Sequence, residues 1–232
     1  MTSHWDELDQ QTTRWQRWQG ILRRQPSAFL LVVQVSVILL LPWLQSVDYG
    51  RTVLTTFGFV ALIIAVLTVR STPALTWLSV LLGVPAAGLE VAALFTDTAT
   101  LEGAAHTALA IFYFYTGFSL IRYMFEDAFV TKDELFAVGA CFTVLLFAFA
   151  YLYLAIQVFY PQSFSSFDGP GQRTFLELIY FSGANLTSVG LSDISAIRPL
   201  ARAWTTIEQL GGVLYVAMVI SRLVALTVIR NR

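Results

Sequence analysis

The chain contains few charged residues, and this scarcity sets its broad class. Of its 232 residues, 12% are charged and 56% are hydrophobic, whereas about a quarter of the residues in a soluble domain are charged. The net charge of -1 excludes the strongly basic surface of a nucleic-acid-binding protein. The composition therefore predicts a membrane protein that contacts lipids and binds no nucleic acid.

Cysteine and histidine are almost absent. The single cysteine, Cys141, cannot form an intrachain disulfide or a thiolate metal site by itself. The two histidines, His4 and His106, belong to no motif with metal-ligand spacing. Catalysis inside a membrane would need a paired nucleophile and base or a pair of carboxylates. We find no such pair, so the sequence predicts neither an enzyme nor a bound cofactor.

Six apolar segments are long enough to cross a bilayer, which takes about 20 residues. Most lysines and arginines fall on one side of the membrane if the N-terminus is cytoplasmic. The sequence therefore predicts an all-α membrane protein with both termini in the cytoplasm. The predicted spans are residues 28–46, 52–69, 74–95, 103–123, 135–160 and 200–229.

Residues 1–26 precede the first span and are expected to form a cytoplasmic amphipathic helix. Trp15, Trp18 and Leu22 recur at helical spacing among several arginines. This helix would lie on the membrane surface or pack on the protein's own cytoplasmic loops, and the sequence does not separate the two.

A long connection separates the fifth and sixth predicted spans, and its end is unusual. An apolar helix over about 174–186 is too short to cross the membrane. It is followed by the polar segment Thr187 to Asp193. Non-helical backbone at membrane depth is tolerated only where it is buried in protein or lines a water-filled path. The alternative is an ordinary polar loop.

The sequence Thr-Ser-Val-Gly-Leu-Ser-Asp at 187–193 resembles the selectivity filter of the potassium channel superfamily, whose usual form is Thr-Thr-Val-Gly-Tyr-Gly-Asp. With the flanking helices, residues 132–230 resemble the pore module of tetrameric cation channels, and six spans match that superfamily's six-span branch. The resemblance implies a homotetramer in the cell membrane that conducts potassium ions through carbonyl oxygens. The implied filter residues are Thr187, Ser188, Val189, Gly190, Leu191, Ser192 and Asp193.

The same resemblance divides the chain. It implies a pore domain at 135–232, with the filter re-entering the membrane between the last two spans, whereas the short connections and the charge pattern predict a four-helix unit at 27–124 and a cytoplasmic linker at 125–134. Tyr180 and Ala184 are the expected supports on the pore helix, and Gly211 and Gly212 are the candidate gating hinge.

The two departures from the usual filter both lie in its outer half. Leu191 replaces the tyrosine whose hydroxyl ties the filter to the pore helices, and Ser192 replaces a glycine. A left-handed Ser192 would cost roughly 1 to 2 kcal/mol per chain, which favours a different outer filter. We therefore expect weaker potassium selection. The alternatives are a non-selective monovalent cation channel and a non-conducting or regulatory protein that retains the channel fold.

The first four spans lack the signature of a voltage sensor. Residues 104–121 contain no arginine or lysine, so steep voltage gating is not expected. Glu90 and His106 are ionisable residues within apolar spans and form a candidate pH-sensitive pair. The other reading is a mutually satisfied polar pair, or a glutamate that reaches toward water.

The charged linker between Arg122 and Glu134 is expected to contact the end of the last span near Arg222. Such a contact would couple the first four spans to opening of the pore. Because the sequence ends at Arg232, directly after the last span, no attached ligand-binding domain is expected.

Overall fold

The computed structural model describes residues 26–45, 76–96, 98–125, 132–167, 169 and 171–230. The predicted N-terminal helix and the second predicted span, 52–69, lie outside these residues. The described elements are α2 (Pro26–Gln45), α4 (Thr76–Phe95), α5 (Ala99–Met124), α6 (Lys132–Phe159), β1 (Phe164–Ser165), α7 (Phe175–Leu186), β2 (Ser195–Ala196) and α8 (Pro199–Arg230).

Five of these helices are long and apolar enough to cross a membrane. They are the helices of Pro26–Trp43, Trp77–Phe95, Ala99–Met124, Asp133–Phe159 and Pro199–Arg222. They correspond to five of the six predicted spans, and the all-helical membrane class is thereby confirmed. Helix α7 has only 12 residues, too few to cross a bilayer.

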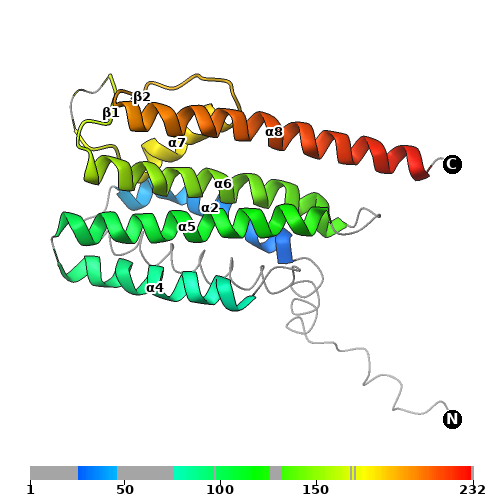
Figure 1. Ribbon diagram of the computed structural model, residues 1–232, viewed down its shortest axis with the longest axis horizontal. Helices are drawn as coiled ribbons and strands as arrows, with labels where there is room; N and C mark the ends of the chain where they lie inside the picture. The colour runs from blue at the N-terminus through cyan, green and yellow to red at the C-terminus, as the bar shows by residue number, and fades with distance from the viewer. Residues whose placement is uncertain are drawn as a thin grey trace, which may run out of the picture.

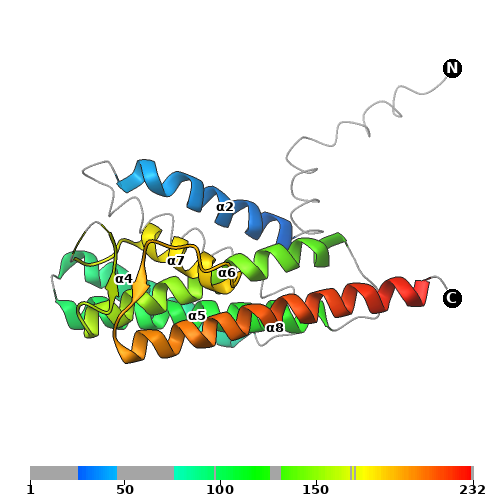
Figure 2. The ribbon, with the colours of Figure 1, turned by 90° about the horizontal axis from the view of Figure 1, so that it is seen from above.

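The long helices run side by side, with α6 at the centre (Figures 1 and 2). Helix α6 contacts α5, α2, α7 and α8, and α4 covers the far side of α5. Aromatic side chains fill the α5–α6 interface: the rings of Tyr113 and Tyr151 are stacked 5.5 Å apart, and Phe147 packs edge-on against Tyr113. Large apolar side chains are exposed along α2, α4 and α8, as helices in contact with lipid or other chains require.

The segment that contains α7 leaves the bundle and returns at the same end. Strand β1 follows α6 and pairs antiparallel with β2, which precedes α8, so that Phe164 lies opposite Ala196. This short ladder joins the end of α6 to the start of α8 (Figure 1). Helix α7 and residues 187–193 lie between these two points in the sequence, and α7 packs on both α6 and α8.

Candidate functional site

The start of α7 is fixed by a capping box. The Thr174 hydroxyl accepts a hydrogen bond from the backbone N–H of Glu177, and the Glu177 carboxylate accepts one from the backbone N–H of Thr174. These bonds satisfy two donors that a helix start leaves free. Arg173 is buried; its guanidinium contacts Glu177 at 3.3 Å and donates to the carbonyl of Gly169. Arg173 thus joins the first turn of α7 to Gly169 and Gly171 of the preceding loop.

The far end of α7 packs directly on α8. The Gln209 amide donates to Asn185 Oδ1 at 2.8 Å. A Cβ on Gly212 would lie 1.9 Å from the carbonyl oxygen of Leu186, closer than real Cβ atoms approach any backbone atom. A glycine at 212 thus lets the backbone of α8 touch the last residue of α7.

Residues 187–190 form a tight turn at the end of α7. Ser188 has a φ of 58° and Gly190 a φ of 70°, both in the left-handed region. The backbone N–H of Ser188 donates to the carbonyl of Asn185, and that of Gly190 donates to the carbonyl of Ala184. These two bonds fold the first half of the segment back onto the helix end.

The outer half of the segment is held by different bonds. The Tyr180 hydroxyl donates to the carbonyl of Leu191 at 3.0 Å, and the backbone N–H of Ser192 donates to the carbonyl of Gly190. Asp193 accepts a hydrogen bond from Ser166 at 3.2 Å. The expected supports on α7, Tyr180 and Ala184, both contact the segment.

The backbone carbonyls of residues 188–191 fall into two groups according to whether they accept a hydrogen bond. Those of Gly190 and Leu191 accept hydrogen bonds within the chain. Those of Ser188 and Val189 accept none among the described residues. Val189 and Leu191 are 62% and 75% exposed in the single chain. Of the four carbonyls at 188–191, those of Ser188 and Val189 therefore remain available to an ion.

The two glycines proposed as a hinge differ in their surroundings. Helix α8 continues through both without a break. A Cβ on Gly211 would meet nothing within 4 Å, whereas Gly212 contacts Leu186. Gly212 thus has a packing role at the end of α7, and the hinge remains a prediction.

Glu90 lies on α4 and His106 on the adjacent helix α5. Both side chains are partly buried. The His106 ring packs against Tyr151 of α6, with 6.3 Å between the ring centroids. The pairing of Glu90 with His106 and its sensitivity to pH remain predictions.

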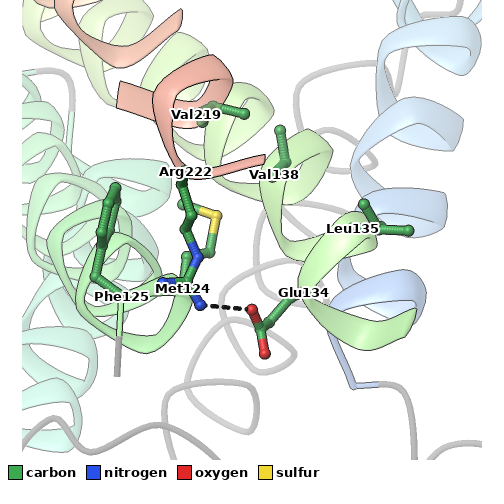
Figure 3. Close-up of a pocket in the computed structure, with 7 residues that line it drawn as sticks. All are labelled: Met124, Phe125, Glu134, Leu135, Val138, Val219 and Arg222. Atoms are coloured by element: carbon green, nitrogen blue, oxygen red, sulfur yellow. Dashed lines mark hydrogen bonds and ion pairs between the residues drawn. The ribbon is translucent and has the colours of Figure 1, made fainter. Parts of the chain in front are cut away.

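At the end of the bundle where α6 begins, α6 and α8 are joined by an ion pair. Glu134 and Arg222 are 2.9 Å apart, and their side chains are 5% and 14% exposed. Arg222 also lies over the Phe125 ring, 5.3 Å from its centroid. Figure 3 shows this pair beside a small pocket lined by Met124, Leu135, Val138 and Val219. The expected contact between the end of the linker and Arg222 is therefore present.

The neighbouring residue, Asp133, binds other helices. Its carboxylate accepts hydrogen bonds from the backbone N–H and the hydroxyl of Ser27, at the start of α2. It also accepts one from the hydroxyl of Tyr123 on α5 at 3.2 Å. An anion at a helix N-terminus is stabilised by the free N–H groups and by the helix dipole. Asp133 is therefore buried where α2, α5 and α6 meet, although it lies in a charged stretch between apolar segments.

A buried acidic residue was overlooked in the sequence. Glu208 lies in α8, is fully buried and accepts hydrogen bonds from Tyr153 and Ser182. The sequence carried a usable signal, because Glu208 is the single acidic residue of an apolar helix and such residues are usually functional or paired. Among the described residues, no group of three His, Cys, Asp or Glu side chains could hold a metal ion.

Comparison with known proteins finds a family model that matches the part of the chain containing this site. Residues 139–228 match a model described as "Ion channel". The match begins in α6 and ends in α8, so that it includes α7 and the whole of 187–193. No curated protein and no solved structure gives a significant match to the chain. The matched segment and the apolar helices support an ion channel in a membrane, which is a transport protein.

Proposed function

We propose that the chain forms a passive cation channel that conducts potassium ions with reduced selectivity, through a pore lined by the carbonyls of 187–193. Four copies surround the pore. The channel resides in the cell membrane with both termini cytoplasmic, and its opening does not depend steeply on voltage.

The half-length helix α7 with its non-helical extension carries this proposal. Both ends of the segment lie at one end of the bundle, where β1 pairs with β2, and both α6 and α8 are long enough to cross the membrane. Backbone of this kind at membrane depth is stable only where it is buried or lines water. A re-entrant pore loop meets that condition.

The available oxygens favour weak selection. An ion that enters a filter exchanges its water shell for oxygens. The carbonyls of Ser188 and Val189 and the Ser188 hydroxyl supply such oxygens at the inner end. In contrast, the carbonyl of Leu191 in the outer half and that of Gly190, which borders it, are engaged in hydrogen bonds within the chain. Fewer ordered ion sites in the outer half would lower discrimination between potassium and sodium.

The test is ion flux through the purified protein in lipid vesicles, measured as reversal potentials in mixed potassium and sodium. The double variant Leu191→Tyr and Ser192→Gly restores the family's outer filter and should raise the potassium-to-sodium permeability ratio about tenfold, which is about 1.4 kcal/mol of discrimination. The matched control is Leu200→Tyr with Ser195→Gly, which places the same residue types outside the filter and should leave the ratio unchanged.

Two outcomes contradict the proposal in different ways. If the natural chain already discriminates as strongly as the double variant, reduced selectivity is wrong. If it carries no ion under any gradient, the alternative of a non-conducting regulatory protein is favoured.

A further inference from the structure

Glu208 sits where three helices meet. It belongs to α8, and its side chain has no exposed surface. One carboxylate oxygen, Oε2, accepts a hydrogen bond from the Tyr153 hydroxyl of α6 at 2.6 Å. The other, Oε1, lies 2.5 Å from the Ser182 hydroxyl of α7. One carboxyl group thus joins α6, α7 and α8.

Burial of this carboxyl requires a compensating interaction. A carboxyl withdrawn from water is costly unless its oxygens are hydrogen-bonded. Both oxygens of Glu208 meet that need, and both partners are hydroxyls on other helices. A leucine of similar volume at 208 would fill the space at no such cost. The hydrogen bonds of Glu208 therefore fix the relative positions of α6, α7 and α8 rather than bury apolar surface.

Glu208 is one of three nearby α8 residues that contact α7; the others are Gln209 and Gly212. Gln209 bonds to Asn185, and Gly212 lies against Leu186. Ser182 is five residues before Thr187, the C-cap of α7. Because the carbonyls of Asn185 and Ala184 accept the bonds that fold residues 188 and 190 back, any shift of α7 moves the filter as well.

We propose that Glu208 is a positioning residue for the filter: by fixing α7 between α6 and α8, it sets where the inner carbonyls stand and thereby sets ion discrimination. The effect on discrimination rests on the proposed channel function. The fixing of α7 does not, and it is tested separately.

Comparison of Glu208→Leu with Glu208→Gln distinguishes the effect of the Glu208 hydrogen bonds from the effect of filling the buried site. Leucine keeps the volume and removes both hydrogen bonds. Glutamine keeps them, because its carbonyl accepts from Tyr153 and its amide donates to Ser182, whose own proton can turn to the carbonyl of Leu146 at 3.3 Å. The matched control is Gln34→Leu, which removes a buried bond between α2 and Thr143 of α6.

The first readout is hydrogen exchange of backbone amides 187–192 in the purified protein, which does not depend on conduction. We expect exchange to be about tenfold faster in Glu208→Leu, because both hydrogen bonds that join Glu208 to Tyr153 and Ser182 are lost. Exchange should be near the natural rate in Glu208→Gln and Gln34→Leu. Equal exchange in Glu208→Leu and the natural chain would overturn the proposal, as would an equal rise in Gln34→Leu.

The second readout is the potassium-to-sodium permeability ratio in vesicles. It should fall several-fold in Glu208→Leu and be retained in Glu208→Gln. If Glu208→Leu does not fold, Tyr153→Phe and Ser182→Ala each remove one bond and should each give a smaller change of the same sign. If the natural chain shows no ion flux but the variants show the expected hydrogen-exchange rates, the channel function is contradicted. The role of Glu208 in fixing α7 is then still supported. An unchanged ratio in Glu208→Leu would refute the link to discrimination.

Discussion

At the scale of single residues, backbone strain lies at Ser188 rather than at Ser192. The family's filter would require a left-handed backbone at Ser192, but the left-handed non-glycine residues among those described are Gln162 and Ser188. Thr187 is the C-cap of α7, and a left-handed residue directly after the cap is a common way to end a helix. The conformational free-energy cost of ending the helix thus falls on Ser188, at the inner end of the segment. The φ of Ser192 lies outside the left-handed region.

The adjacent glycines Gly211 and Gly212 form a matched pair for a test of stability. Gly212→Ala places a methyl group 1.9 Å from the carbonyl of Leu186, so that α7 and α8 must separate. We expect a loss of about 1 to 3 kcal/mol in stability, as for overpacked sites. Gly211→Ala meets nothing within 4 Å and should be neutral or stabilising by up to about 1 kcal/mol, because alanine favours the helix.

Thermal unfolding of both variants in detergent measures this difference. Similar losses in the two variants would contradict the packing role of Gly212. Reduced opening in a stable Gly211→Ala variant would instead support the hinge.

At the scale of elements, the first turn of α6 connects two parts of the chain. Asp133 binds the start of α2 and the end of α5, whereas Glu134 binds Arg222 of α8 (Figure 3). Adjacent residues of a helix point in different directions, so a single turn can hold both contacts. A displacement of α2 or α5 would therefore reach α8 through this turn.

The Glu134–Arg222 pair is expected to hold α8 against α6 in a closed pore. Glu134→Gln removes the negative charge that balances the largely buried Arg222 guanidinium, which costs about 3 kcal/mol. Because opening would require the ends of α8 to part, we expect a higher open probability in single-channel recordings in symmetric solution. The double variant Glu134→Gln with Arg222→Gln should return toward the natural value, because two amides can bond to each other.

Arg202→Gln removes an arginine from the other end of α8 and is the control for this experiment. An unchanged open probability in Glu134→Gln would rule out the pair as a closing contact. A double variant no closer to the natural chain than Glu134→Gln alone would show that the effect is not specific to this pair.

At the scale of the whole molecule, one chain leaves its candidate filter exposed. Val189 and Leu191 are mostly uncovered, and α8 has many exposed large apolar residues, among them Ile207, Leu210, Val213 and Leu214. A single strand of carbonyls cannot surround an ion, so the candidate filter would need further copies. These surfaces are where we expect neighbouring copies and lipid to pack.

The number of copies is directly measurable. The chain has a mass of 25.8 kDa, and we expect the detergent-solubilised protein to have a protein mass of about four times that value, because closed rings of identical chains form by repeating one interface. Light scattering with correction for bound detergent gives this mass. A monomer that still conducts ions would contradict the tetrameric pore, and Glu134→Gln should leave the mass unchanged.

The amino-acid sequence was enough to predict the membrane class, five of the described helices and the position of the short helix before 187–193. These features depend on long apolar runs and on local signals such as the Thr174–Glu177 capping box, which neighbouring residues decide. The contacts of Asp133, Glu208 and Gly212 were decided only by the tertiary structure. Each joins residues far apart in the sequence, and a charge between apolar runs has the same appearance whether it faces water or bonds to another helix. The strain at Ser188 was likewise hidden, because it depends on how α7 ends against α8.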